Sequence, residues 1–433
     1  MLDPLPLELR LPLSQRSARS YWLVTFGCQM NKADSEQIAT LLEARGLVMA
    51  ASLDLADLVV FMTCCVRERA DERLFGQVAS LGRSDQIICV GGCIGERDGE
   101  ALKAELPNLS YVFGTAALGQ GYDSSAVRRE HPWAAWLPII TGCDNFCSYC
   151  IVPYVRGRER SKPFAEVLEE VERLRADGVQ ELTLLGQNVN SYGRDLYGQP
   201  RFAELLRAVA ASGVPRIRFT TSHPKDLSEA TIAAFAELDN VMPALHLAVQ
   251  SGSDRVLAAM GRHYTRQHYL DLVRRLQAAC QDSGKGRIAL STDIIVGFPG
   301  ESEEDFEATM ELVEAVGYSQ VFTFIYSRRP GTKAAELSDD TPHQQIQARF
   351  NRLLALVQEQ AYAANQAEFD QILPVLFEGA SKRDPQMLSG RSPRNQTVHA
   401  PLPTGAAPAD FAGKIALVQI SEAKTWYLKG RLV

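Results

Sequence analysis

Long apolar runs are missing from this sequence. No stretch approaches the roughly 18 consecutive apolar residues that a membrane-spanning helix needs, so we expect no membrane association. The first residues also lack a basic start followed by an apolar block, which argues against a secretory signal peptide. We expect residues 1–19, where leucine and proline alternate before the chain turns polar, to form a loose tail.

A disulfide framework and a strong basic charge are missing as well. The nine cysteines are odd in number and clustered, which favours metal binding in a reducing cytoplasm. A formal net charge of −7 argues against nucleic-acid binding over the whole surface, but it leaves room for a local basic patch. The 433 residues, 46% hydrophobic and 22% charged, predict a globular protein of two or three domains.

Three cysteines lie close together at Cys143, Cys147 and Cys150, and we call them the contiguous triplet. A structural zinc site and a saturated iron–sulfur cluster each take four ligands. Three thiolates at this spacing can hold one face of a four-iron cluster and leave one iron open to a small molecule. The alternatives are three unrelated thiols, or part of a zinc knuckle with its fourth ligand elsewhere. Tight spacing of a rare residue favours the cluster.

The amino-terminal part of the chain alternates strand and helix patterns. Residues 21–26, 58–62 and 87–90 are rich in aromatic or β-branched residues and predict strands. Helical patterns follow the first two strands, and Asp34 or Ser35 is expected to cap the first helix. This alternation predicts a doubly wound parallel sheet over residues 20–118.

A cysteine follows the end of each predicted strand: Cys28, Cys64 and Cys93, the dispersed triplet. The carboxyl ends of parallel strands share one edge, where ligands bind, so these cysteines are expected to converge. The alternative is three buried small apolar side chains, because free cysteine is often buried. Cys65 and Cys89 lack this placement, and Cys89 is expected to belong to the core.

A second alternating block follows a polar, turn-rich stretch at 119–132, which predicts a linker. Within residues 133–365, strands are predicted at 135–140, 181–185, 216–220, 244–250, 287–296 and 318–326, and helices at 164–176, 267–279 and 303–316, among others. About six βα units predict a partial (β/α)6 barrel rather than another doubly wound sheet. Polar residues at the strand ends are expected to line the active-site face. They are Gln187, Asn188, Ser222, His223, Gln250, Ser251, Asp293, Tyr326 and Ser327.

The carboxy-terminal part changes character again. A helical pattern at 345–368 gives way to short β-like runs spaced by glycine and proline, which predict a small β-barrel over 366–433. This segment holds eight Lys or Arg and six Asp or Glu, a net charge of +2 in an otherwise acidic chain. A basic small barrel is typical of RNA-binding modules. A stabilising cap with ordinary surface charge is the alternative.

Several stretches together resemble the radical-SAM methylthiotransferases, and the resemblance covers nearly the whole chain from about Ser20. The run GCDNFCSYCIVPYVRGRERS is similar to the family's motif for the cluster that binds S-adenosylmethionine (SAM). The resemblance implies a [4Fe–4S] cluster on the contiguous triplet, whose open iron chelates the amino and carboxylate groups of SAM. Reduction then cleaves SAM to methionine and a 5′-deoxyadenosyl radical. FGCQMN, TCCVRERA and VGGC resemble the family's amino-terminal domain and imply a second [4Fe–4S] cluster on the dispersed triplet.

Three subfamilies compete, and the MiaB type is the most similar. FGCQMNKADSEQ, TCCVRERADERLFGQ, LHLAVQSGSDRVLAAMGRHYT, STDIIVGFPGESEEDF and FIYSRRPGTKAA resemble that type, which acts on tRNA carrying isopentenyladenosine next to the anticodon. The carboxy-terminal segment resembles the TRAM domain, a small RNA-binding barrel. Met62 (usually Asn), Ala248 (usually Pro) and Lys162 (often Arg) depart from the family pattern without removing a cluster ligand. The doublet Cys64-Cys65 leaves an ambiguity in which the motif favours Cys64.

The implied reaction replaces a carbon–hydrogen bond at C2 of the modified adenine by a carbon–sulfur bond. The carbon–hydrogen bond has no group on which an acid or a base could act, so the reaction calls for radical chemistry carried by a cofactor. We hypothesise that one SAM methylates a sulfur held on the second cluster and that a second SAM supplies the radical, with no side chain needed as a general base. Expected partners are the anticodon stem-loop of tRNA, a sulfur donor, and an electron donor such as flavodoxin or ferredoxin. We expect a cytoplasmic monomer.

Residues beyond the cluster ligands are expected to bind SAM: Gln250, Asp293, Asn188 and Arg156. Asp293 is expected to act through ribose or amino contacts. Arg156 opens a basic run that alternatively contacts anticodon-loop phosphates or is an ordinary solvated face.

Three aromatic or histidine side chains lie near the expected site residues or strand ends in the sequence. Tyr149, between two cysteines, either shields the cluster, packs on adenine or simply packs in the core. His223 and His246 are expected to be structural. Aromatic and arginine side chains that stack on RNA bases are expected but cannot be assigned from the sequence.

Three alternative functions stay open. The same chemistry on threonylcarbamoyladenosine in tRNA is one, and methylthiolation of an aspartate in a ribosomal protein is another. A third is a non-catalytic iron–sulfur protein that binds RNA or carries electrons. Two triplets that each leave an iron open argue against the third, because electron carriers usually saturate their clusters.

Overall fold

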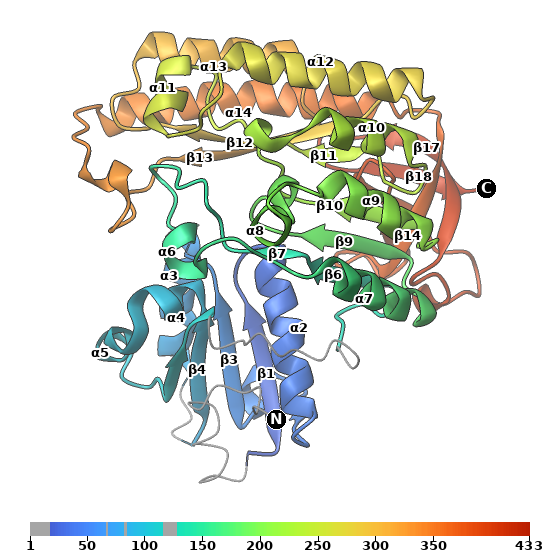
Figure 1. Cartoon of the computed structure of the whole chain (residues 1–433). Coiled ribbons are helices and arrows are strands. Elements are labelled where there is room, and N and C mark those ends of the chain that lie inside the picture. The colour runs from blue at the N-terminus through green and yellow to red at the C-terminus, as the bar shows by residue number, and fades with distance from the viewer. Residues whose placement is uncertain (1–17, 66–67, 82–84, 116–127) are drawn as a thin grey trace.

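The computed structural model describes residues 18–65, 68–81, 85–115 and 128–433. The predicted tail (1–19) and linker (119–132) therefore lie mostly outside the described residues. Figure 1 shows three parts: an amino-terminal sheet in blue and cyan, a central helix-covered sheet from green to orange, and a carboxy-terminal barrel in red. Each part falls within one of the predicted domains, 20–118, 133–365 and 366–433, whose boundaries stay predictions.

The amino-terminal sheet is parallel throughout, in the order β2-β1-β3-β4-β5. All side chains of β3 and β4 are buried, as expected for central strands covered on both faces. Helix α2 packs Ile38 and Leu42 on one face, and α3 packs Leu74 and Val78 on the other, which confirms the doubly wound fold. The bounds are β1 Ser20–Thr25, α2 Gln29–Glu43, β2 Val48–Met49, β3 Leu58–Thr63, α3 Glu68–Ser80, β4 Ile87–Gly92, α4 Cys93–Asp98, α5 Leu102–Glu105 and β5 Tyr111–Phe113.

Helix α2 begins earlier than the sequence suggested. Its N-cap is Cys28, whose backbone N–H and thiol each lie 3.3 Å from the Asn31 side-chain oxygen. Asp34 and Ser35, the expected caps, are buried inside the helix, so that prediction was wrong. Cysteine is not among the common N-cap residues, which is why a cap preference pointed further along the chain.

The central sheet is a partial barrel. Strands β6, β9 and β10 form one parallel group and β11, β12 and β13 a second, and isolated parallel bridges such as Ile217–Val241 and Ser222–Leu247 join the two. Within the described residues the six strands therefore run in chain order, as predicted. The strands are β6 Ala134–Pro138, β9 Glu181–Leu185, β10 Arg216–Phe219, β11 Ala244–His246, β12 Ala289–Val296 and β13 Gln320–Ile325.

Helices cover the outer side of this barrel (Figure 1). The helices of nine or more residues each contribute apolar side chains to the largest core; α12, for example, contributes Tyr269, Leu272 and Leu276. Burying a side chain of this size stabilises the fold by about 1.5–3 kcal/mol. The helices are α7 Phe164–Ala176, α8 Arg194–Tyr197, α9 Phe202–Ala211, α10 Glu229–Glu237, α11 Asp254–Ala259, α12 Arg266–Asp282, α13 Glu303–Val316 and α14 His343–Gln366.

Strand β12 shows how the barrel orients its side chains. The even-numbered residues from 290 to 296 are buried, whereas Ser291 and Asp293 are only partly buried and share the opposite, inner face. Parallel pairing is in register, so Asp293 lies beside Phe322 of β13, and Ser291 lies beside His246 of β11. The alternation therefore directs polar side chains into the barrel.

The carboxy-terminal segment forms a closed barrel in the order β14-β15-β16-β18-β17, as predicted. Its core includes Val375, Phe377 and Val418. Arg218, from the central sheet, donates to the backbone carbonyls of Ser392 and Pro393 and so fastens the barrel to that sheet. Its strands are β14 Ile372–Ala380, β15 Met387–Arg391, β16 Thr397–Pro401, β17 Ile415–Ala423 and β18 Leu428–Leu432. Within the described part of the chain, no helix is long and apolar enough to cross a bilayer.

Candidate active site

The contiguous triplet occupies one loop between two short antiparallel strands, β7 (Ile140–Thr141) and β8 (Arg160–Ser161). Gly142 has a positive φ of 77°, and a Cβ there would lie 2.0 Å from the Arg158 carbonyl oxygen, so only glycine fits. The Cys143 N–H donates to the Gly157 carbonyl at 3.1 Å, and the Cys150 N–H donates to the Cys147 carbonyl at 2.9 Å. These bonds hold the three cysteines in one compact turn.

Burial dominates the electrostatics of this loop. Burial is the main reason why the pKa of Cys143 is raised to about 11 and that of Cys150 to about 12, and the neighbouring Cys147 contributes to both shifts. The mutual effect of the thiols shows that they lie near one another. Iron would reverse the direction, because a bound cation favours the thiolate.

Arg262 is a buried cation that no motif in the sequence singles out. Its guanidinium lies 3.7 Å from the Cys147 sulfur, donates to the Ala248 carbonyl and packs over the Tyr264 ring. The residue is 4% exposed, and the backbone of Met260 nearby accepts a bond from Ser148. Arg262 belongs to no sequence motif with the spacing of metal ligands, so only the folded structure shows that it lies beside Cys147.

Unpaired polar atoms gather at the ends of the barrel strands. Gln187, Asn188, Ser222, His223 and Tyr326 each have a buried polar side-chain atom with no hydrogen-bond partner. Buried polar atoms are nearly always paired in native proteins, so a group of them on one face indicates a binding site for a polar ligand. These residues follow β9, β10 and β13, which agrees with the predicted active-site face.

Three of the predicted SAM contacts lie on this face. Gln250 is buried with a positive φ of 73°, a conformation that costs about 1–3 kcal/mol and often marks a functional site. Its N–H donates to the Asp293 carbonyl at 2.9 Å, which fixes the two residues side by side. Asn188 donates its amide to Asp226 at 2.7 Å, and its own oxygen has no partner. These positions fit SAM binding, which stays a prediction.

His246, expected to be structural, is part of a polar chain on the inner face. Its Nε2 lies 3.3 Å from an Asp293 carboxylate oxygen, and its Nδ1 lies 3.1 Å from the Ser291 hydroxyl. The imidazole also meets the Phe322 ring edge-on at 5.9 Å. His223, by contrast, is buried, and burial lowers its pKa well below the ordinary value, so it stays neutral.

The dispersed triplet forms at the carboxyl edge of the amino-terminal sheet. Cys28 caps α2, Cys64 follows β3, and Cys93 is the first residue of α4. A Cβ on Gly27 would lie 2.6 Å from the Cβ of Cys64, so glycine permits the close approach of these two segments. Cys89 is buried in β4, as predicted.

Hydrogen bonds between sulfurs join these cysteines in pairs. The Cys64 thiol hydrogen-bonds to Cys28 and lowers its pKa to about 6, while the Cys65 thiol hydrogen-bonds to Cys93 and lowers its pKa to about 7. The charge of Arg156 contributes to both shifts. Cys65, which the strand-end argument set aside, therefore lies against the triplet.

Arg156 has partners other than the SAM-contact residues. It ends α6 (Val152–Arg156), which lies between the amino-terminal sheet and the central domain (Figure 1). Its Nε lies 3.3 Å from the Cys93 sulfur, and its Nη2 pairs with Asp34 at 2.6 Å. A contact between Arg156 and SAM stays a prediction, but the observed partners belong to the dispersed triplet.

The donor sets fit iron–sulfur clusters better than single metal ions. Among the described residues, no group of three or more His, Cys, Asp or Glu side chains is placed to bind one metal ion. In a four-iron cluster each cysteine binds a different iron, so its thiols need not converge on one point. Three thiols in each set suit clusters that keep one iron open; at the dispersed set Cys65 lies beside Cys93 as a further thiol, and the sequence motif assigns the ligand to Cys64.

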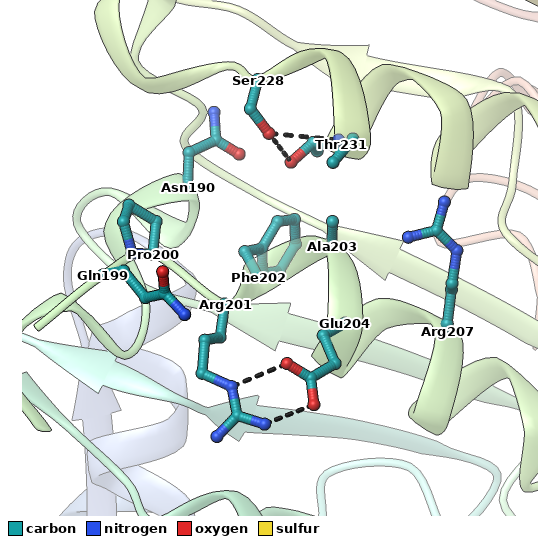
Figure 2. A pocket seen from close by; sticks show the side chains of 11 residues that line it. Asn190, Gln199, Pro200, Arg201, Phe202, Ala203, Glu204, Arg207, Ser228 and Thr231 are labelled. Atoms are coloured by element: carbon teal, nitrogen blue, oxygen red, sulfur yellow. Dashed lines mark hydrogen bonds and ion pairs between the residues drawn. The ribbon is translucent and has the colours of Figure 1, made fainter. Parts of the chain in front are cut away.

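A separate hollow of about 250 Å³ lies beside the barrel, away from the cysteines. Figure 2 shows Arg201 paired with Glu204 below it and Ser228 bonded to Thr231 above it. Its charged side chains are already paired, Arg201 with Glu204 and Arg207 with Glu237, and no cysteine lines it. This hollow therefore has no thiol to bind an iron–sulfur cluster.

Two family models match this chain. The Radical SAM superfamily model matches residues 137–313, which contain the contiguous triplet and most of the partial barrel. A model described as Uncharacterized protein family UPF0004 matches residues 20–114, which contain the dispersed triplet. Fold and motifs together define a radical SAM enzyme that carries an additional amino-terminal α/β domain.

Curated relatives identify the family within this class. A tRNA-2-methylthio-N(6)-dimethylallyladenosine synthase of Carboxydothermus hydrogenoformans is 42% identical over 96% of this chain and 99% of its own length. Another, of Acidothermus cellulolyticus, is 45% identical over 90% of this chain and 84% of its own. The chain belongs to this family of tRNA-2-methylthio-N(6)-dimethylallyladenosine synthases.

A solved structure agrees on the fold. The radical S-adenosylmethionine methyltransferase TsrM from Kitasatospora setae, with tryptophan substrate and a SAM analog bound, superposes with a TM-score of 0.53 at 14% identity. The match covers 73% of this chain and 75% of that one. At this identity the likeness concerns the fold alone.

Proposed function

We propose that this chain attaches a methylthio group to C2 of N(6)-isopentenyladenosine next to the anticodon of tRNA, using two [4Fe–4S] clusters and two molecules of SAM. One observation carries the proposal: two cysteine triplets lie at the two ends of α6, one just before it and one against its last residue, Arg156. Each triplet offers three ligands where an electron carrier uses four. Family membership supports the tRNA and the isopentenyl group, which is also called dimethylallyl.

The bound cofactors supply the methyl group and the radical that the reaction needs. In our proposal the contiguous triplet holds the cluster that engages SAM, and the dispersed triplet holds the second cluster. Gln250, Asp293 and Asn188 bind SAM at the carboxyl ends of the barrel strands. The strained Gln250 backbone is held by its bonds to β12 on both sides, which keeps its side chain in place when ligands come and go.

The inner face of the barrel is proposed to orient the adenine and to exclude water. His246 and Asp293 present a polar edge there, and Phe322, 37% exposed, presents an aromatic one. No side chain is required to remove a proton from the reacting carbon. Orientation and exclusion are therefore the tasks that remain for the chain itself.

The carboxy-terminal barrel is proposed to bind RNA. Trp426 is 55% exposed, Lys429 lies over the Tyr427 ring at 5.7 Å, and that ring meets His399 edge-on. Exposed aromatic and basic side chains suit stacking on unpaired bases and contact with phosphates. We take the domains to be 20–118, 133–365 and 366–433, as the sequence suggested.

Other partners are proposed from the chemistry. The reaction consumes electrons and sulfur, so it needs a reductant such as flavodoxin or ferredoxin and a sulfur donor. Oxygen-sensitive clusters and free thiols suit a reducing cytoplasm. We propose that the protein acts there as a monomer.

The decisive experiment offers three substrates in parallel to the same enzyme. The clusters are reconstituted anaerobically, SAM, reductant and sulfide are added, and isopentenylated tRNA, threonylcarbamoylated tRNA and a ribosomal protein are supplied separately. Mass spectrometry is expected to find a methylthio product on the first substrate only. A product on either other substrate, or none on any, would refute the proposed function.

A further inference from the structure

We propose that Arg156 is a positioning residue for the second cluster: its guanidinium donates to the Cys93 sulfur and raises the reduction potential of the cluster on the dispersed triplet. The inference rests on the proposed function only in assigning a cluster to that triplet. Hydrogen bonds to cluster sulfurs and the local net charge are among the factors that set the potential of an iron–sulfur cluster.

The guanidinium spans the elements that carry two of the ligands. Its Nε lies 3.3 Å from the sulfur of Cys93, at the start of α4, and its Nη2 lies 2.6 Å from Asp34 on α2, the helix that Cys28 caps. The Arg156 side chain is only 7% exposed. A buried charge is costly unless it is paired, so these two contacts fix its position.

The backbone around Arg156 is held equally firmly. Ile151 and Val155 pack in the same core as Cys93, and the Thr115 hydroxyl donates to the Val155 carbonyl at 2.7 Å. Gly157 follows with a positive φ of 74°, and its carbonyl accepts the Cys143 N–H. Neighbouring residues of one segment therefore contact both triplets, Arg156 through its side chain and Gly157 through its backbone.

Charge decides what this contact does. Asp34 balances the guanidinium, so the pair is nearly neutral as a whole, but the positive end faces the sulfurs. An N–H donated to a thiolate withdraws electron density and stabilises the reduced, more negative cluster. The same cation favours any additional anionic sulfur at that cluster. A salt bridge that only joined the two domains would need the contact with Asp34 but not the contact with the Cys93 sulfur.

The matched control is Arg158, two residues further on. Its guanidinium is 72% exposed and pairs with Asp144 beside the contiguous triplet, so Arg158→Gln removes a charge without touching the dispersed one. Asp34→Asn removes the anionic end of the buried pair and leaves the cation in place. Arg156→Lys keeps the charge but cannot reach both partners with one planar group.

The test measures the midpoint potentials of both reconstituted clusters by redox titration followed by electron paramagnetic resonance. The signal that changes on adding SAM identifies the contiguous-triplet cluster. Arg156→Gln is expected to lower the reduced-to-oxidised ratio of the other cluster about tenfold at fixed potential, which is about 59 mV for one electron. Asp34→Asn is expected to shift it the opposite way, Arg156→Lys to restore it partly, and Arg158→Gln to leave it unchanged.

Shifts of the same sign in Arg156→Gln and Asp34→Asn would overturn the inference, as would no shift in either. If the Arg156→Gln variant does not retain the second cluster, the midpoint potentials of the Asp34→Asn and Arg156→Lys variants still show whether the charge raises or lowers the potential. No tRNA is present in this measurement, so it can succeed even if the proposed substrate is wrong. A failed shift in an enzyme that methylthiolates isopentenylated tRNA would refute only the role of Arg156.

Discussion

The two cysteine triplets each bring three thiols together, one within a single loop and the other from three separate segments of the chain. The contiguous triplet is one turn of backbone, closed by hydrogen bonds between residues 143 and 157 and between residues 147 and 150. The dispersed triplet collects one cysteine from each of three segments and exists only because parallel strands end at one edge. A local site can thus be identified from spacing, whereas a dispersed site requires the fold.

Their electrostatics differ as well. Burial raises the pKa of Cys143 to about 11 and that of Cys150 to about 12, whereas sulfur hydrogen bonds and Arg156 lower that of Cys28 to about 6 and that of Cys93 to about 7. The opposite directions of these shifts follow from what surrounds the thiols: burial at the first site, and hydrogen-bond donors with a buried cation at the second.

The largest expected effect separates the two sites by task. Cys143→Ala should reduce SAM cleavage to background, because the cluster that engages SAM loses a ligand. Cys28→Ala should retain measurable cleavage but give no methylthio product. Chromatography of 5′-deoxyadenosine and mass spectrometry of the tRNA nucleosides measure the two outcomes. Equal loss of both products in both variants would contradict this division.

A second prediction concerns the Cys64-Cys65 doublet within the dispersed site. Cys64 pairs with Cys28, while Cys65 donates to Cys93 and is packed in the apolar core. Cys64→Ser should therefore lower the iron content from about eight to about four per chain, and Cys65→Ser should keep about eight. Colorimetric iron counting after reconstitution decides between them. The reverse result would make Cys65 the ligand.

Much of the fold could be predicted because its patterns are local. The predicted boundaries of β9, α7 and α13 match the structure to the residue, since strand and helix periodicity need only neighbouring residues. The strand predicted at 244–250 was too long: β11 ends at His246, and Gln250, with its positive φ, cannot continue a regular ladder.

The grouping of the cysteines could be predicted where they share a motif or a strand end. Spacing identified the contiguous triplet, and the parallel sheet identified the dispersed one. The partners of Arg156 and the position of Arg262 depend on how distant segments pack, and no periodicity in the sequence reports that packing. The same limit explains why Asp34 was taken for a helix cap rather than for the counterion of a buried cation.

A third prediction tests whether the affinity for SAM depends on Asp293 at the inner face of the barrel. Asp293→Asn keeps the side-chain shape but removes the charge that faces His246 and, in our proposal, SAM. SAM affinity should fall about 10- to 100-fold, the loss expected for a charged hydrogen bond of about 1.5–3 kcal/mol. Calorimetry on the reconstituted protein measures it. Asp271→Asn, on the exposed side of α12, is the matched control. An equal loss in both variants would remove Asp293 from the site.

The smallest expected effect concerns the helix that carries Cys28. Glu36 of α2 is buried, accepts the Glu130 N–H at 2.9 Å, and has a pKa raised by burial from 4.5 to about 7. Between those values the folded chain holds a proton that the unfolded chain has released, so stability falls as pH rises. Glu36→Gln keeps an acceptor and removes the proton. From pH 5 to pH 8, wild type should lose roughly 1–2 kcal/mol relative to this variant, measured by urea unfolding. Glu172→Gln, at an exposed position of α7, should follow wild type, and a flat difference for Glu36→Gln would show that this carboxyl is already ionised in the folded protein.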